Sequence, residues 1–191
     1  MNRIARPAVL LSFLLAAAHV VPAQTSPEYV SPVQAGPHGS APGMKVKLLS
    51  ENAGQRDFAV IFSPGDDPYA GLTEFAQKYD VKSAHFTAIG DFRDVKLAWF
   101  DMQKKMFRVN PVDQRVEVGS LVGDIALLEG KPSVHMHCVV ALQDGTTRGG
   151  HILEAHVDPL LEVFVTVDPV PLVKKHDPAT GLNVIQPDAT P

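Results

Sequence analysis

The residues best suited to chemistry lie in one stretch, residues 134–157, which contains three closely spaced histidines. His135 and His137 are two positions apart in a segment with the pattern of a β-strand. Side chains at positions i and i+2 of a strand point to the same face, so the two imidazoles lie roughly 7 Å apart and can converge on one metal ion. Met136 and Cys138 are then expected on the opposite face, toward a hydrophobic core.

His151 is the third candidate ligand, and strand register decides whether it reaches the other two. Asp144-Gly145 is a strong signal for a two-residue hairpin turn. Regular pairing from that turn would direct His151 away from His137, whereas one extra residue in the second strand would place it opposite Val139 and diagonal to His137. The pair Gly149-Gly150 is a favourable place for such a β-bulge. We therefore predict a bulge that aims His151 at the other histidines.

Three neutral imidazoles would suit Zn²⁺ or a related transition ion and would leave a fourth coordination position open. Such an ion could lower the pKa of a bound water molecule and support hydrolysis or hydration. The alternative is a structural role, with the HxH pair packed and hydrogen-bonded in the sheet or at a subunit interface. No general base is evident at a defined spacing. Whether the protein is an enzyme is therefore open, and no role is assigned to His85, Glu154 or His156.

The segments around these histidines have the patterns of short strands. One helix is expected over residues 69–79, with Asp67 as its N-cap and Pro68 at its first position. Gly90 is expected to end a strand, and the tail after Lys175 is expected to be irregular. One helix among many strands indicates an α+β fold with a mainly antiparallel sheet. Apolar patterns predict strands at 44–49, 57–62, 83–89, 95–101, 105–109, 116–128, 133–142, 147–157 and 161–167.

Residues 1–23 have the pattern of a secretory signal peptide. An arginine-containing start is followed by an apolar run over 8–18 and by the small-residue exit Val21-Pro22-Ala23. The apolar run is shorter than the about 20 residues that a membrane-spanning helix needs. We therefore expect an exported protein, periplasmic or extracellular, without stable membrane insertion. An uncleaved anchor is the alternative.

Composition limits the remaining function classes. Residues 24–43 are rich in Pro, Gly and Ser, which predicts a flexible leader before a folded domain over 44–186 and a short tail over 187–191. The chain has 17 Lys and Arg against 21 Asp and Glu, a net charge of −4. Nucleic-acid affinity depends on an excess of Lys and Arg, so we do not expect DNA or RNA as a partner.

Cys138 is the lone cysteine, which excludes an intramolecular disulfide and favours a buried apolar role.

Several segments occur in the order seen in the plants and prokaryotes conserved (PPC) family. The chain resembles this family over residues 44–186, and HxH followed by GGH resembles its single-domain prokaryotic branch. The resemblance implies an α+β fold with a mainly antiparallel sheet and one principal helix, assembly as a homotrimer, and metal ligation, for zinc, by His135, His137 and His151. The segments are FAVIFSPGDDPYAGLTEFAQKY, FTAIGDF, VEVGSLVGDIAL, HMH, RGGHILEA, LEVFV and HDPATGL.

Comparison with plant members of the family and with the cupins narrows the functions that the resemblance implies. Plant members of the family join the domain to AT-hooks and bind AT-rich DNA, but this chain is acidic and has no Arg-Gly-Arg-Pro hook. The cupins also use HxH, but they place a glutamate three to four residues later, where this chain has Val140 and Ala141. We therefore expect an exported, metal-binding, PPC-like protein whose ion completes the fold or holds a small ligand. A metal-dependent hydrolase or hydratase is the alternative, and DNA binding is the least favoured function.

Overall fold

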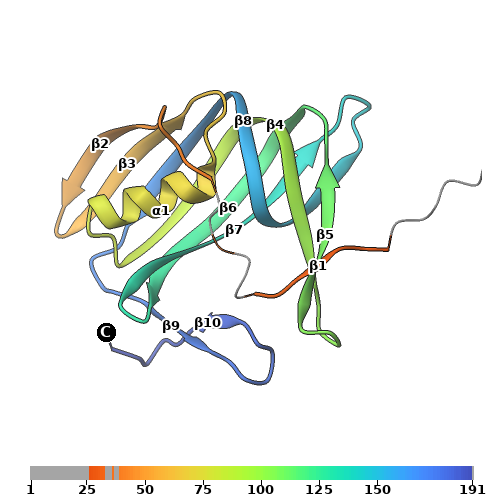
Figure 1. Cartoon of the computed structure of the whole chain (residues 1–191). Coiled ribbons are helices and arrows are strands. Elements are labelled where there is room, and N and C mark those ends of the chain that lie inside the picture. Colours follow the sequence, from red (N-terminus) through yellow and green to blue (C-terminus); the bar gives the residue numbers. More distant parts are fainter. Residues whose placement is uncertain (1–25, 33–35, 37–38, 191) are drawn as a thin grey trace, which may run out of the picture.

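The computed structural model describes residues 26–32, 36 and 39–190 (Figure 1). The signal peptide predicted for residues 1–23 lies outside this part of the chain. The described elements are β1 (Tyr29–Val30), β2 (Lys45–Asn52), β3 (Gln55–Phe62), α1 (Pro68–Lys78), β4 (Ser83–Asp101), β5 (Met106–Val112), β6 (Val116–Leu128), β7 (Lys131–Ala141), β8 (Thr147–Val167), β9 (Val173–His176) and β10 (Asn183–Ile185).

The strands form one mainly antiparallel sheet with the order β1-β5-β4-β6-β7-β8-β3-β2. Strand β4 also pairs with β8, so β4, β6, β7 and β8 form a closed circuit of hydrogen-bonded neighbours. Strand β9 pairs with the end of β6 in parallel and with β10 antiparallel. Figure 1 shows α1 lying across one side of the curved sheet and the β9–β10 hairpin below it. The predicted α+β class, with a mainly antiparallel sheet and one principal helix, is confirmed for the described residues.

The helix begins and packs as its sequence predicts. The Asp67 side chain caps it by accepting a hydrogen bond from the Ala70 backbone N–H at 2.8 Å, and Pro68 occupies the first turn. Leu72 and Phe75 are fully buried against the sheet. Burying one such side chain contributes about 1.5–3 kcal/mol, so packing rather than helix propensity holds α1 in place. No helix in the described ranges has both the length and the apolar character needed to cross a bilayer.

Two strands are longer than predicted because each continues through an expected break. Strand β4 runs through Gly90, where a Cβ atom would lie 2.4 Å from the carbonyl oxygen of Leu160. Gly90 therefore allows β8 to approach β4 closely and does not end the strand. Strand β8 likewise joins the two segments predicted at 147–157 and 161–167. Because of this length, β4 pairs with β6 over 83–92, with β5 over 95–101 and with β8 over 84–98, which closes the circuit.

Two segments predicted to lack regular structure contain short strands. Tyr29 and Val30, in the range predicted to be a flexible leader, pair with the edge of β5. Ala41 is buried in the main core. The tail expected to be irregular forms the β9–β10 hairpin. Open strand edges supply backbone partners for these short strands. Such long-range pairing leaves no periodic pattern in the segments themselves, so the irregular tail expected after Lys175 is corrected by the β9–β10 pairing. The flexible leader predicted over 24–43 stays a prediction.

Gly123 allows β6 to pack closely against its neighbours, including β7, the strand that contains His135. A Cβ atom there would lie 2.3 Å from a ring carbon of Phe86 and 2.4 Å from the carbonyl oxygen of His135. Gly119, on the same strand, offers a matched comparison because its nearest atom would lie 3.7 Å away. The first position has no room for a methyl group, whereas the second has ordinary van der Waals space.

Gly123→Ala is therefore expected to lower the free energy of unfolding by about 1–3 kcal/mol, the usual cost of overpacking. Chemical denaturation of both variants measures the effect, and Gly119→Ala should stay within about 0.5 kcal/mol of the wild type, as open-surface substitutions do. Equal stability of the two alanine variants would show that β6 does not pack as described.

Candidate metal site

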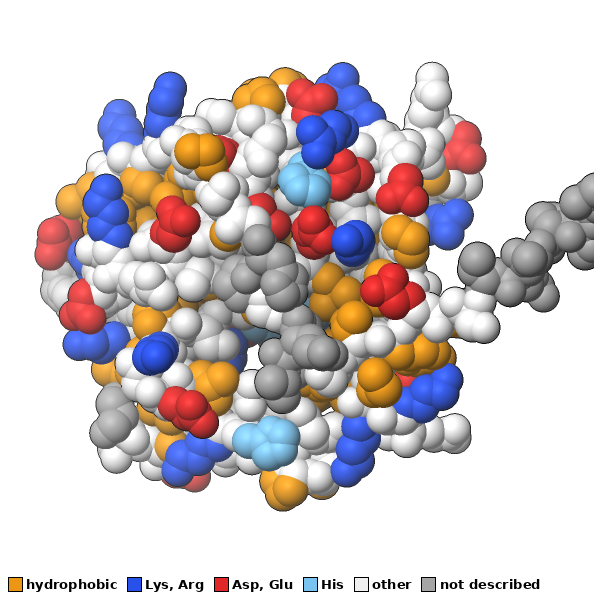
Figure 2. All heavy atoms as spheres, viewed as in Figure 1, with side chains coloured by type: hydrophobic (Ala, Val, Ile, Leu, Met, Phe, Trp, Pro, Cys, Tyr) orange, Lys and Arg blue, Asp and Glu red, His pale blue; other side chains and the backbone are white. Residues whose placement is uncertain are grey.

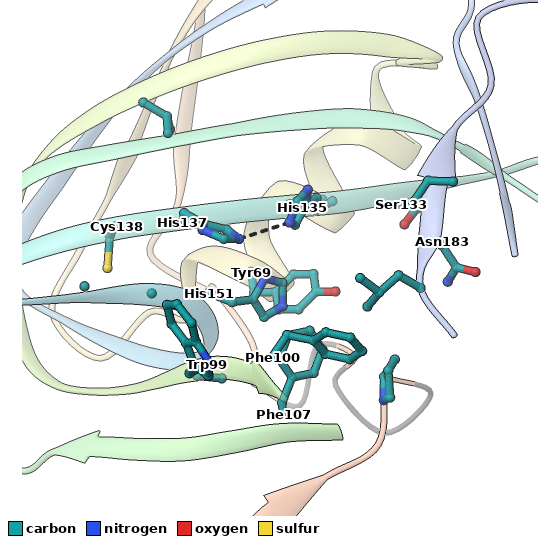
Figure 3. A pocket seen from close by; sticks show the side chains of 18 of the residues that line it. Tyr69, Trp99, Phe100, Phe107, Ser133, His135, His137, Cys138, His151 and Asn183 are labelled. Carbon is teal, nitrogen blue, oxygen red and sulfur yellow. Dashed lines mark hydrogen bonds between the residues drawn. The ribbon is translucent and has the colours of Figure 1, made fainter. Parts of the chain in front are cut away.

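The structure brings the three predicted ligands together. One ring nitrogen from each of His135, His137 and His151 lies within 4.8 Å of the other two. The Nε2 atoms of His135 and His137 are 3.2 Å apart. Figure 3 shows the His151 ring on the neighbouring strand, close to the two rings of β7. Within the described ranges, no other set of three or more His, Cys, Asp or Glu side chains is grouped in this way. We call these three residues the histidine triad.

The register that forms the triad differs from the one predicted. His151 lies directly opposite His137, and Val139 lies opposite Gly149. Directly paired residues of neighbouring strands share a face, so His151 needs no bulge before it to face His137. The predicted placement of His151 opposite Val139 is therefore wrong, although the prediction that the three rings come together is right.

The cause is the loop between β7 and β8, which has three residues and not two. The backbone N–H of Leu142 donates to the Thr146 carbonyl at 2.8 Å, so Gln143, Asp144 and Gly145 form the loop. Gly145 has a φ of 80°, the left-handed conformation that a three-residue hairpin loop requires at its last position. The additional loop residue shifts the pairing by one position, which brings His137 and His151 together.

The paired glycines before His151 serve close packing. A Cβ atom at Gly150 would lie 2.6 Å from the carbonyl oxygen of Ala98, so the glycine lets β8 lie against β4. A bulge does occur in β8, but at Leu153, between the residues that pair with Lys96 and Leu97. Leu153 joins the small apolar cluster of Ala98, Phe107 and Val109. That irregularity belongs to the β4–β8 pairing, whereas the β7–β8 register has no shift, so the bulge predicted at Gly149-Gly150 is wrong.

Burial keeps two members of the triad, His137 and His151, neutral. The His151 ring stacks on Phe107, with ring centroids 4.7 Å apart and planes 9° from parallel. Burial, followed by the neighbouring His135, His137 and Lys174, lowers the pKa of His151 to about 3. Burial and His135 also lower the pKa of His137. A neutral imidazole is the form that binds a metal, so His137 and His151 need not lose a proton near pH 7.

Two features show that the residues fit an ion. The His151 Nδ1 atom is buried and has no hydrogen-bond partner among the described residues, which costs about 1–3 kcal/mol for a polar atom. The Nε2 atoms of His135 and His137, 3.2 Å apart, would repel each other if both carried lone pairs with nothing between them. A proton or a cation shared by these rings removes the repulsion. The donor set is three imidazoles, which suits zinc and related transition ions.

Asp124 and Lys174 support His135 on the Nδ1 side of its ring, away from His137. Asp124 lies opposite His135 in the β6–β7 pair, and its Oδ2 atom is 3.3 Å from His135 Nδ1. The buried Lys174 places its Nζ atom 2.6 Å from Asp124 Oδ1 and 3.2 Å from the Ser133 carbonyl oxygen. Burial opposes ionisation of Asp124, but the hydrogen bonds from His135 and Lys174 outweigh it and keep the pKa of that carboxyl below its usual value.

The tautomer of His135 follows from this arrangement. An ionised carboxylate can only accept hydrogen bonds, so the Nδ1 atom of His135 carries the proton and Nε2 keeps its lone pair toward His137. A carboxylate behind a ligating histidine is a common means of fixing ring orientation and raising basicity. Neither Asp124 nor Lys174 is predicted from the sequence. Pairing of the two long strands could have suggested Asp124, whereas Lys174 lies in the tail expected to be irregular.

The other titratable candidates lie outside the triad. Glu154 Oε2 pairs with Lys96 Nζ at 2.6 Å, and His156 Nδ1 lies 2.6 Å from Asp94 Oδ1. His85 Nδ1 lies 3.5 Å from Asp168 Oδ2. The structure therefore places His85 and His156 beside carboxylates and Glu154 beside Lys96, and gives none of the three a place in the candidate metal site.

Cys138 faces the core, as predicted. It is buried together with Met136 and Val140, on the face of β7 opposite His135 and His137. Burial raises the pKa of the Cys138 thiol to about 12, so the side chain stays protonated. The protonated thiol is a poor metal ligand and nucleophile, which leaves the imidazoles as the donors of this strand.

Comparisons with known proteins agree with the fold. The family model of the Plants and Prokaryotes Conserved (PCC) domain, abbreviated PPC above, matches residues 49–168. A comparison with curated proteins gave no match. A structure from Ralstonia eutropha JMP134, of a protein provisionally described as DNA-binding, is 30% identical, with a TM-score of 0.66 over 73% of this chain and 95% of that chain.

Two archaeal structures are also similar. A metal-containing protein from Archaeoglobus fulgidus is 26% identical, with a TM-score of 0.64 over 74% of this chain and 98% of that chain. A plant- and prokaryote-conserved protein from Pyrococcus horikoshii is 23% identical, with a TM-score of 0.65 over 76% of this chain and 97% of that chain. The second likeness concerns the fold alone.

Asp124→Asn is expected to weaken zinc affinity by about 10–100-fold, because the amide holds the Nδ1 proton of His135 less strongly. Competition with a chromogenic chelator measures the affinity. The variant also leaves Lys174 buried without its carboxylate, so the double variant Asp124→Asn/Lys174→Met separates the two effects. The double variant should regain thermal stability relative to Asp124→Asn but not zinc affinity. Wild-type affinity in Asp124→Asn would rule out this positioning role.

Proposed function

The chain belongs to the Plants and Prokaryotes Conserved domain family, and on this premise we propose that it binds one divalent transition ion, zinc, through His135, His137 and His151. The observation that carries the proposal is the convergence of three imidazoles, two of which burial holds neutral. Two nitrogens on one tetrahedral zinc lie about 3.3 Å apart, close to the separation of His135 and His137. When bound, the ion would supply a Lewis acid with an open coordination position.

The site can hold a ligand at a metal, but it lacks a side chain placed to act as the general base of a hydrolysis. The cavity beside the triad is lined by no Asp or Glu among the described residues. Asp124, behind His135, is engaged by both His135 and Lys174 and so is not free to accept a proton from water. A general base has to reach the proton that it removes. We therefore place ligand binding at a metal ahead of a hydrolase or hydratase.

Nucleic acid is not the partner that we propose, although the Ralstonia eutropha relative is provisionally described as DNA-binding. The net charge of −4 gives no general attraction to phosphates. On the face shown in Figure 2, basic and acidic side chains are interspersed and do not gather into one basic surface. Export fits the signal peptide predicted for residues 1–23, and we propose a periplasmic or extracellular location.

Self-association as a homotrimer is part of the same proposal. Ile89 on β4 and Leu160 and Phe164 on β8 are large, apolar and exposed on neighbouring strands. Exposed apolar side chains that lie together favour burial by another protein surface. A second copy is the occupant that the family resemblance implies. We call these three residues the apolar sheet patch.

Sedimentation velocity tests the assembly. The wild type should sediment as a trimer, and Phe164→Asp should sediment as a monomer because it places a charge in the apolar sheet patch. Val170→Asp introduces the same charge at an exposed apolar residue outside the patch and should leave the trimer intact. A monomeric wild type at micromolar concentration would exclude the proposed assembly.

Elemental analysis of protein purified without chelator tests the metal site. We expect about one zinc per chain in the wild type, because three imidazoles form a sufficient ligand set. His135→Ala, His137→Ala and His151→Ala should each lose most of the metal. His85→Ala, a substitution of an exposed histidine outside the triad, is the matched control and should keep it. Wild-type protein without stoichiometric metal, even after incubation with zinc, would refute the proposal.

A further inference from the structure

The histidine triad opens into a cavity of about 700 Å³, within the range of sites that enclose small organic molecules. The triad supplies part of its wall, and other parts come from the β4–β5 hairpin and the outer faces of β6 and β7. In Figure 3, Trp99, Phe100 and Phe107 lie on one side of the imidazoles, and Asn183 lies at one end. The volume far exceeds what a metal ion and a water molecule require.

Most of the cavity wall is apolar. Trp99 is 70% exposed, Val122 50% and Val139 46%, and all three line the cavity together with Phe100 and Phe107. An exposed tryptophan and two exposed valines inside one concave site lose contact with water when an apolar group enters. Each methylene group buried there strengthens binding about fourfold. The walls therefore favour a ligand with an apolar tail.

The C-terminal hairpin forms the remaining wall through Leu182, Asn183 and Val184, which lie beyond the residues that the family model matches. Several contacts fix this hairpin in place. Asn183 pairs with His176 across β9 and β10, and the Thr180 hydroxyl donates to Asp177 Oδ2 at 2.7 Å. Lys105 Nζ also donates to the Pro178 carbonyl at 3.1 Å. The wall is thus preformed, which lowers the entropic cost of binding.

The charges in the cavity determine which polar group of a ligand would bind next to the triad. Besides the histidines, Lys174 is the one charged side chain among the described lining residues, and its charge is balanced by Asp124 at 2.6 Å. Tyr69 and Cys138 also line the cavity, but burial raises the pKa of each and keeps it neutral. Three imidazole ligands bring no negative charge, so the charge of a bound divalent cation would remain uncompensated. A single anionic oxygen donor at the open coordination position would offset that charge. Ser133 and Asn183 add a hydroxyl and an amide near His135 (Figure 3).

We propose that this cavity binds a small monocarboxylate with an apolar tail, its carboxylate directed to the triad and its tail lying against Trp99, Val139 and Val184. The inference rests on the proposed metal site, because the metal supplies the positive charge at the polar end. An organic cation would meet that charge unfavourably. A polyanion would find one balanced lysine and no other Lys or Arg side chain on the described wall.

Tryptophan fluorescence tests the inference directly, because Trp99 is the one tryptophan of the chain and lines the cavity. Zinc-loaded protein is titrated with acetate, hexanoate, hexanol and hexylamine, and zinc content is measured on the same samples. Hexanoate should bind at least tenfold more tightly than acetate, since two buried methylene groups already give about a tenfold gain. Hexanol and hexylamine should bind at least tenfold more weakly than hexanoate.

Two charge-matched variants of β10 locate the tail. Val184→Asp should weaken hexanoate binding at least tenfold, whereas Ile185→Asp, next to it but outside the cavity lining, should not change it. Val184→Thr keeps the side-chain shape and should weaken binding to a smaller degree, which guards against misfolding of the aspartate variant. Zinc content should be the same in all three variants.

Each contrary outcome has a distinct meaning. Stoichiometric zinc with equal affinity for acetate and hexanoate, or with hexanol or hexylamine bound as well as hexanoate, overturns this inference and leaves the metal site intact. Absence of zinc overturns both the metal site and this inference. Trp99 emission that changes with protein concentration but with none of the four probes would identify a second copy as the occupant, which also overturns it.

Discussion

The pairing of β7 with β8 determines where the three histidines lie. His135 and His137 share a face of β7 because they are two residues apart, but His151 reaches them only because it lies directly opposite His137. That register is set by a three-residue loop whose Gly145 adopts a left-handed conformation. A shift of one residue would turn His151 to the other face of the sheet. The triad therefore depends on the loop as much as on the histidines.

The ion pair between Asp124 and the buried Lys174 joins this site to the rest of the chain. Asp124 fixes the ring of His135 from β6, and Lys174 brings the start of the C-terminal hairpin to the same carboxylate. The next strand of that hairpin, β10, forms one wall of the cavity. Breaking the pair would leave a buried charge without its partner. The orientation of a candidate ligand and the position of the cavity wall therefore depend on one interaction.

Much of the site could be predicted from residue types and spacing, but its support could not. The HxH spacing fixes one face of a strand, and the core-facing positions of Met136 and Cys138 follow from the same alternation. The direction of the register shift could not be predicted, because Asp144-Gly145 favours a two-residue loop but also fits a three-residue loop with Gly145 in the left-handed conformation. Lys174 could not be predicted either, since its partner Asp124 lies 50 positions away and the tail around it shows no apolar period. Gly90 and Gly150 indicate chain breaks or bulges locally, whereas in the structure they permit close contact between β4 and β8.

The central claim is that the imidazoles of His135, His137 and His151 together bind one ion. X-ray absorption spectroscopy of the zinc-loaded protein tests it most directly, because it counts the ligands and identifies their atoms. The account predicts three imidazole nitrogens at about 2.0–2.1 Å and one further oxygen or nitrogen donor. A spectrum with sulfur in the coordination sphere, or with fewer than three imidazoles, would contradict it.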